Sequence, residues 1–135
     1  ACLGAIDALL AAPALAADDF SEYVRLNETF HAQLAVLSDS PVLQRQIELA
    51  TALPFASPSG FVLAQSVMPM ARHILIVAQD QHRCIVEAIE GRESARAEAI
   101  AREHARLAAR NLRHAMQQET PMRLVPGGAL IRRAG

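Results

Sequence analysis

The stretch QHRCIVEAIEGRESARAEAIAREH, residues 81–104, decides the fold, because it predicts two helices joined by a tight turn. Apolar residues recur at intervals of three and four on both sides of Gly91, which is the spacing of one helix face. Gly91 is a typical helix stop, since glycine is common just past the last turn of a helix. His82 and His104 each stand within the apolar face of their helix. The stretch therefore predicts two consecutive helices that each project a histidine inward.

Proline, glycine and capping residues divide the rest of the chain into further helices. The expected elements are a short helix over residues 3–12 that stops at Pro13, a helix capped by Asp18 or Asp19 that runs to about Ser38, a helix opened by Ser40 and Pro41, a loop over residues 54–60, a helix from about Ser59 to Ile89 with a kink or restart near Pro69, and a last helix over residues 93–118. No alternating strand pattern interrupts them. The chain is therefore predicted to be all-α, an antiparallel bundle of about six helices with an irregular tail over residues 121–135.

The composition supports this class and excludes others. The 135 residues include 27 alanines, 52% are hydrophobic, and the formal net charge is -1. Alanine favours helix, and a chain this apolar and weakly charged is neither disordered nor a generally basic nucleic-acid binder. Cys2 and Cys84 are too few for a disulfide framework.

The opening run resembles a secretory signal but carries Asp7 inside its apolar stretch, so we interpret it as an amphipathic helix cut short at its start. The apolar run at residues 61–78 is interrupted by polar residues, so no membrane span is expected and a cytoplasmic location is favoured.

The charges are unevenly distributed along the chain. Residues 1–50 carry a net charge of -5 and residues 91–135 a net charge of +5. Arginines at helical spacing on the last helix could form a docking face for an acidic partner or nucleic acid. They could equally form a solvated face of ion pairs, which is the interpretation we favour. The arginines of this stripe are Arg102, Arg106, Arg110 and Arg113.

Three histidines on three different predicted helices share an apolar setting. His31 follows Asn27 by one turn on the inner face of its helix, and His82 and His104 lie on the inner faces of two others. In an antiparallel bundle these faces converge on one interior. A single buried histidine is usually satisfied by hydrogen bonds alone, and this alternative stays open. Three neutral imidazoles close together also suit a divalent metal, because histidine nitrogen is a common ligand of Zn²⁺ and Ni²⁺.

Two segments resemble a known family. YVRLNETFHAQLAVLSDSPVL, residues 23–43, resembles the [DN]-x-x-F-H helix of the FCD domain, the C-terminal effector domain of FadR-type regulators in the GntR family of bacterial transcription factors. Residues 81–104 resemble the H-x-x-I-x-x-A-I-x-x-G-D segment of the same domain, followed by a later histidine. The resemblance covers about residues 3–118. It implies an FCD-like domain over residues 1–120 that binds a ligand and forms homodimers. It also implies a separate N-terminal winged helix-turn-helix, outside this sequence, that contacts operator DNA.

The resemblance also implies a site. Many FCD domains hold a metal through an Asp and three His and bind a small carboxylate beside it, to modulate DNA binding. Carried over to this sequence, the ligands are Asn27, His31, His82 and His104, and Zn²⁺ or Ni²⁺ is expected. Asn27 stands where those metal-binding domains have the Asp, and an amide oxygen is a weaker ligand than a carboxylate. Arg92 replaces the Asp that usually follows Gly91 and is expected to affect a helix cap. Residues within about a turn of the ligands are candidates for contact with the effector: Arg25, Gln79, Arg102 and Asn111.

Three further expectations concern the interpretation of this site. His73 is expected to be structural or to support the ligands, and His114 to lie on the surface. The same fold could instead hold a metal-free effector pocket. A small metal-dependent hydrolase is a third alternative, but it lacks a general base, because Glu28 and Glu103 neighbour the histidines in sequence and point elsewhere on a helix. We therefore expect a sensor domain that is not an enzyme.

Overall fold

The computed structural model describes residues 1–52, 59, 62 and 70–116, with the backbone alone at residues 112 and 114–116. These residues form five helices and no strand, which confirms the all-α prediction. The helices are α1 (Cys2–Leu10), α2 (Ala17–Val36), α3 (Pro41–Thr51), α5 (Ala71–Glu90) and α6 (Ser94–Met116). The loop predicted at residues 54–60, the helix predicted between Ser59 and Pro69, and the tail at residues 121–135 lie outside the described residues, apart from Ser59 and Val62. Within the described part, no helix is both long and apolar enough to span a bilayer.

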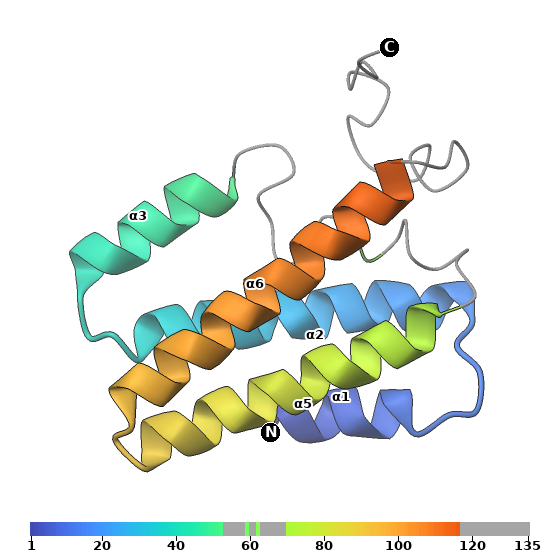
Figure 1. Cartoon of the computed structure of the whole chain (residues 1–135), viewed down its shortest axis with the longest axis horizontal. Coiled ribbons are helices and arrows are strands. Elements are labelled where there is room, and N and C mark those ends of the chain that lie inside the picture. Colours follow the sequence, from blue (N-terminus) through green and yellow to red (C-terminus); the bar gives the residue numbers. More distant parts are fainter. Residues whose placement is uncertain (53–58, 60–61, 63–69, 117–135) are drawn as a thin grey trace.

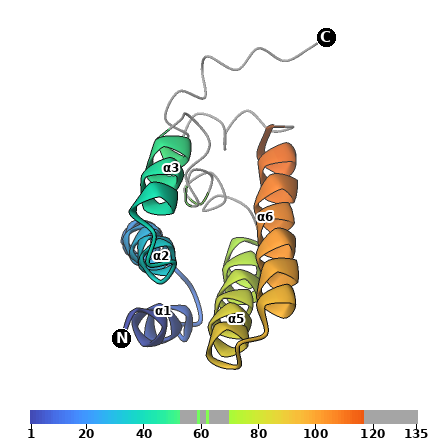
Figure 2. The same ribbon diagram turned by 90° about the vertical axis from the view of Figure 1, so that its left-hand side faces the viewer.

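The helices pack in two groups that face each other. Figure 2 shows α1, α2 and α3 stacked on one side and α5 and α6 on the other. The helices α5 and α6 run antiparallel as a hairpin and make the most extensive helix-to-helix contact, while α1 packs against both α2 and α5 (Figure 1). The inner faces of α2, α5 and α6 are thereby brought together, as a bundle requires.

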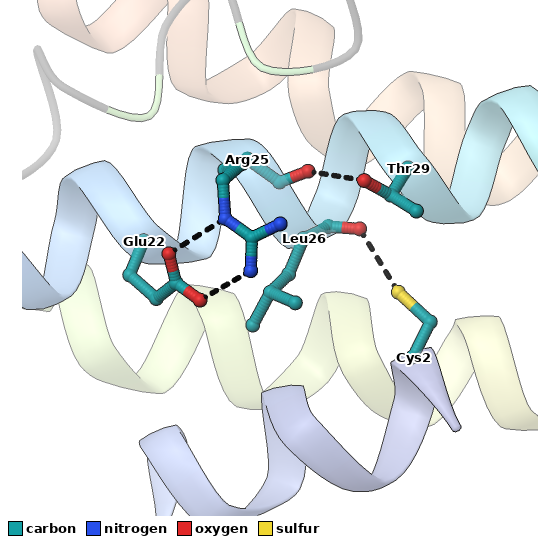
Figure 3. A network of polar contacts seen from close by, with 5 residues as sticks. All are labelled: Cys2, Glu22, Arg25, Leu26 and Thr29. Atoms are coloured by element: carbon teal, nitrogen blue, oxygen red, sulfur yellow. Dashed lines mark hydrogen bonds and ion pairs between the residues drawn. The ribbon is translucent and has the colours of Figure 1, made fainter.

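The core lies where α1 meets α2 and the first half of α5. Each of its large apolar side chains contributes about 1.5–3 kcal/mol through removal from water. The thiol of Cys2 donates to the carbonyl of Leu26 at 3.1 Å and ties the start of α1 to α2 (Figure 3). The buried members of this core are Ile6, Leu10, Phe20, Tyr23, Leu26, Val62, Ala71 and Leu75.

The helix starts agree with the sequence at one place and differ at another. Ser40 caps α3 by accepting from the Leu43 amide, and Pro41 takes the first position, as predicted. The predicted cap of α2 at Asp18 or Asp19 is wrong, because the N-cap is Ala16. Asp19 instead occupies the third helical position and accepts from the Ala16 amide at 2.7 Å. The carboxylate thus still accepts a hydrogen bond from a backbone amide at the helix start, but from the third position inside the helix.

The apolar face of α2 ends earlier than the spacing suggests. Leu37 follows Leu34 at a spacing of three, which fits the inner face, but it lies beyond the last helical residue, Val36, and is 65% exposed. The following helix, α3, contains no buried residue, and Val42 and Leu49 on it are mostly exposed. This end of the described structure therefore presents apolar side chains to solvent.

The turn between α5 and α6 uses a different residue from the one the sequence indicates. Gly91 ends α5 as predicted, yet its φ of -74° is right-handed. The left-handed position is taken by Arg92, with φ 56°. The Arg92 amide donates to the Ile89 carbonyl and the Glu93 amide to the Ala88 carbonyl, the two bonds of a Schellman cap. A position that usually favours glycine is thus occupied by an arginine.

Candidate metal centre

The structure brings three histidines together from three helices. His31 comes from α2, His82 from α5 and His104 from α6, and each offers a ring nitrogen within 4.8 Å of the other two. The ring centroids of His82 and His104 are 4.5 Å apart, and His31 lies 5.2 and 5.4 Å from them. Phe30 packs on the His82 ring with a centroid distance of 4.3 Å and covers it from one side. The result is a compact cluster of imidazoles with an aromatic cover.

Burial keeps these imidazoles neutral. His82 is fully buried, and His31 and His104 are partly buried. Desolvation, followed by the proximity of His104, lowers the pKa of His31 from 6.5 to about 4. Desolvation also lowers the pKa of His82, and the neighbouring His104 and His31 add to this effect. The pKa of His104 is lowered by burial as well. Neutral imidazole is the form that coordinates metal, so the cluster is in its ligating state at neutral pH.

The hydrogen bonds of His82 fix which of its nitrogens carries the proton. Gln79 Nε2 donates to the Leu3 carbonyl at 3.0 Å and to Asp7 Oδ1 at 2.9 Å, so this end of the amide is the donor end. The other end, Gln79 Oε1, lies 3.2 Å from His82 Nδ1 and can only accept. The proton of His82 is therefore on Nδ1, which leaves the lone pair of Nε2 directed at the cluster.

His104 is held in a similar way. Its Nδ1 lies 3.1 Å from Gln81 Oε1, which accepts the proton of that nitrogen. With the Gln81 oxygen toward its Nδ1, His104 directs the lone pair of Nε2 at His82 Nε2, 3.2 Å away. Zn–N bonds of about 2.0–2.1 Å place two tetrahedral ligands about 3.3 Å apart. The spacing and protonation of the pair therefore fit a shared cation.

Two further buried polar atoms are candidate ligands. Among the described residues, His31 Nε2 and Asn27 Oδ1 are buried and have no hydrogen-bond partner. The Ser59 hydroxyl donates to the Val24 carbonyl, so at 3.0 Å it accepts from Asn27 Nδ2. The orientation of the Asn27 amide is thus fixed with its oxygen free. A buried acceptor without a partner costs about 1–3 kcal/mol, and a bound cation would remove that cost for both atoms.

A small cavity adjoins the cluster. It has a volume of about 40 Å³, room for about one to three water molecules. Asn27 and His104 both line it, together with Asn111, an expected effector contact that is 8% exposed. Asn111 follows His104 by seven residues, two turns of helix, and so lies on the same face. The remaining wall is largely apolar and includes Tyr23 and Leu75.

The other expected effector contacts divide into two groups. Gln79 is buried and contacts His82, as described above. Arg25 and Arg102 are exposed and pair with acids on their own helices, Glu22 and Glu98 (Figure 3 for Arg25). Arg25 precedes Asn27, and Arg102 precedes His104, by two residues, which is about 200° around a helix. Neither arginine can reach the cluster, so the expectation that they contact the effector finds no support in the structure.

His73 is not close to the centre either. It precedes His82 by nine residues, two and a half turns, and therefore lies on the opposite face of α5, where it is exposed. The expectation that it supports the ligands is wrong. The expectation for His114 concerns a side chain outside the described residues. Glu103 is exposed and pairs with Arg106 and Arg110 on its own helix, so it faces away from the three histidines.

Sequence reasoning missed the residues that orient the ligands. Gln81 and Ser59 reach the site from another helix or from a distant part of the chain, and no local pattern reveals such contacts. Asp7 did carry a signal, because a charged residue within an apolar run needs a partner. That partner is Gln79, with Arg83 completing an ion pair to the same carboxylate.

Comparison with known proteins identifies the family. The sequence model of the FCD domain matches residues 3–107, most of the chain. The chain belongs to the FCD family. The FCD domain is the effector-binding domain of GntR-type regulators, a regulatory module and not a catalytic one. No curated protein matches the chain.

Proposed function

We propose that this FCD domain is a metal-containing sensor that binds a small organic acid and thereby modulates DNA binding by a separate N-terminal domain. The observation that carries the proposal is the convergence of His31, His82 and His104, with ligand nitrogens within 4.8 Å of one another. The metal would be held by these three imidazoles and by Asn27 Oδ1, and Zn²⁺ or Ni²⁺ suits this nitrogen-rich donor set. When bound, such an ion supplies a Lewis-acidic position for the carboxylate of the effector.

The cavity explains how binding could be linked to a change of shape. At about 40 Å³ it holds water but not an organic acid of several carbon atoms. In our proposal such a ligand binds an enlarged arrangement of the cavity more tightly than the one described. A ligand shifts an equilibrium only through this kind of differential affinity. Asn111 lines the cavity and would donate to the free carboxylate oxygen of such a ligand.

A second candidate keeps the fold without the metal. A groove of about 860 Å³ lies between α2 and α3 and reaches the His31 side chain at one wall. This volume falls within the range of pockets that bind drug-sized ligands. A larger apolar effector could occupy the groove with His31 as a hydrogen-bonding group. The two candidates differ in whether ligand binding requires a metal.

We further propose that the full regulator belongs to the FadR subfamily, acts in the cytoplasm on operator DNA, and is a homodimer. The exposed apolar side chains of α3, among them Val42 and Leu49 on one face, favour association, because a contiguous exposed apolar patch commonly marks an interaction surface. Effector binding would then change the relation between the two protomers.

The test is metal analysis of the purified domain together with thermal denaturation. We expect about one Zn²⁺ or Ni²⁺ per chain in the native protein and none in His82→Ala. The matched control is His73→Ala, which removes an exposed histidine from the opposite face of the same helix and should keep the metal. Small carboxylates should raise the melting temperature of the metal-loaded protein, since a ligand at 100 times its Kd adds about 2.7 kcal/mol. Stabilisation that is equal with and without chelator would favour the metal-free groove instead.

A further inference from the structure

The side chain of Gln79 connects the candidate metal centre to α1. Its amide nitrogen donates to two groups of α1, the Leu3 carbonyl at 3.0 Å and Asp7 Oδ1 at 2.9 Å. Its amide oxygen accepts from His82 at 3.2 Å. Gln79 itself is 4% exposed, so its amide is shielded from water. One rigid amide thus holds a ligand histidine on one side and a separate helix on the other.

The contact with Asp7 is itself anchored. The Arg83 guanidinium pairs with the same carboxylate, and its Nε lies 3.3 Å from Asp7 Oδ1. Asp7 therefore cannot turn away from Gln79 without breaking an ion pair to α5. The amide of Gln79 also cannot flip, because its oxygen would then face two acceptors on α1. The orientation of the His82 ring is consequently set by groups on α1.

This arrangement predicts reciprocal coupling. If α1 no longer packed against α5, Gln79 would be free to rotate. His82 would then no longer be held in one tautomer. Fixing His82 on a cation would in turn hold Gln79 in the orientation that α1 needs. Groups that orient a metal-ligating histidine through its second nitrogen typically change metal affinity 10–100-fold when they are removed. Thermodynamic linkage requires that any effect of α1 on the metal equals the effect of the metal on α1.

We propose that Gln79 is a positioning residue for His82 and that, through Asp7, it couples occupancy of the metal centre to the docking of α1. The inference rests on the proposed metal-binding function. It gives the centre a regulatory output that requires no contact between the effector and α1. The first helix of the domain is held in place through the Asp7–Gln79–His82 chain, and the strength of that hold depends on whether the metal is bound.

Three variants separate the two halves of the proposal. Gln79→Ala removes both contacts and should lower Zn²⁺ affinity 10–100-fold. Gln79→Glu keeps an acceptor for the His82 proton but repels Asp7, so it should loosen α1 and lower Zn²⁺ affinity only by the factor that Asp7→Ala does. Asp7→Ala touches none of the three histidines and should still lower Zn²⁺ affinity about five-fold, at the low end of allosteric couplings. Gln33→Ala is the matched control, because Gln33 is exposed on α2.

The readouts are a competition titration with Zn²⁺ and hydrogen exchange of the α1 amides with and without the ion. In the native protein, Zn²⁺ should slow hydrogen exchange of the α1 amides. The factor of this slowing should equal the factor by which Asp7→Ala lowers Zn²⁺ affinity. In Gln79→Ala and Gln79→Glu, Zn²⁺ should leave exchange in α1 unchanged. Equal Zn²⁺ affinity of Gln79→Ala and the native protein would overturn the positioning role, and α1 exchange indifferent to bound Zn²⁺ would overturn the coupling.

A measurement without metal separates this inference from the function on which it rests. The ¹⁵N shifts of the metal-free protein should show His82 protonated on Nδ1, and this signature should weaken in Gln79→Ala but persist in Gln79→Glu. If the native protein binds no metal and the signature is present, the proposed function fails while the positioning role stands. An unchanged signature in Gln79→Ala would refute the positioning role by itself.

Discussion

Asn27 is the residue on which the strength of the centre depends most. Its oxygen is buried and, among the described residues, has no hydrogen-bond partner, while its nitrogen is held by Ser59. As a proposed ligand, the neutral amide would supply an oxygen without charge, whereas the metal-binding FCD domains that the sequence resembles supply a carboxylate at this position. The three neutral imidazoles add no negative charge either. A divalent cation bound here would therefore keep its full charge in a buried site, which weakens binding.

Replacement of this amide tests its role directly. Asn27→Asp should tighten Zn²⁺ binding about ten-fold or more, about 1.4 kcal/mol, because a carboxylate both ligates and compensates the ion. A competition titration measures the change. Gln33→Glu is the control, because it adds the same charge on the exposed side of the same helix. Equal affinities of Asn27→Asp and the native protein would show that position 27 is not a ligand.

The histidine cluster also predicts how stability depends on pH. Burial lowers the pKa of His31 to about 4, against 6.5 in an unfolded chain. As the pH falls below 6.5, the unfolded chain takes up protons that the folded chain refuses. The contribution of His31 to stability is therefore complete above pH 6.5 and is lost as the pH falls toward 4. Each such group can cost up to about 1.4 kcal/mol per pH unit.

Denaturant unfolding in the presence of chelator, measured between pH 7.5 and 5, checks this prediction. The native domain should lose stability steeply below pH 6.5, and His31→Asn should lose less over the same interval because one titrating group is gone. His73→Asn should follow the native curve, since that side chain is exposed in the folded protein. Parallel curves for the native protein and His31→Asn would contradict the depressed pKa.

At the scale of the element, the turn between α5 and α6 stores strain that can be removed. Arg92 adopts a left-handed φ of 56°, which costs a residue with a side chain about 1 kcal/mol. Arg92→Gly removes this strain but adds the conformational entropy that glycine loses on folding, roughly 0.5–1 kcal/mol. The free energy of unfolding should therefore rise by up to about 0.5 kcal/mol. Arg92→Ala separates this effect from loss of the guanidinium, because it keeps the strain and should change stability little. Urea denaturation gives both values, and a destabilised Arg92→Gly would show that the turn is not strained.

The comparison of sequence and structure is clearest for whole helices. Apolar spacing and the Ser40–Pro41 start predict α3 and α5 well, because those signals depend on local chemistry. Which side chains near the histidines point toward the site is less predictable. Arg25 and Arg102 lie close to ligands in sequence yet point away, since a separation of two residues reverses the direction of a side chain. Asn111, two turns from His104, lies on the right face. Angular position around the helix is thus a better guide than distance along the chain.

At the scale of the whole molecule, the three histidines could be assigned to one interior because each stood on an apolar face. What the sequence could not show is how their second nitrogens are held. Gln81 reaches His104 from α5, and Asp7 reaches His82 through Gln79 from α1. These contacts depend on the packing of helices far apart in sequence. The convergence of the ligands was therefore predictable, and the protonation state of each was not.

The exposed apolar side chains of α3 lead to the last prediction. Val42 and Leu49 are 67% and 55% exposed and, being seven residues apart, lie on the same face of the helix. If this face meets a second copy of the chain, two glutamates there repel across the symmetric contact and bring charge into an apolar interface. The double variant Val42→Glu with Leu49→Glu should therefore weaken the dimer at least ten-fold, about 1.4 kcal/mol.

Sedimentation equilibrium over a range of protein concentrations measures the dimer constant. The control is Ile76→Glu with Ile89→Glu on α5, where the native side chains are 37% and 40% exposed and the dimer should persist. The converse result, dissociation by the α5 pair and not by the α3 pair, would place the interface on α5. A monomer at every concentration of the native protein would overturn the proposed homodimer. Any of these results also bears on regulation, because α3 follows directly from the helix that carries Asn27 and His31. An interface on α3 would be joined to the proposed ligands of α2 through residues 32–40, and effector binding could then be transmitted to the partner protomer through that segment.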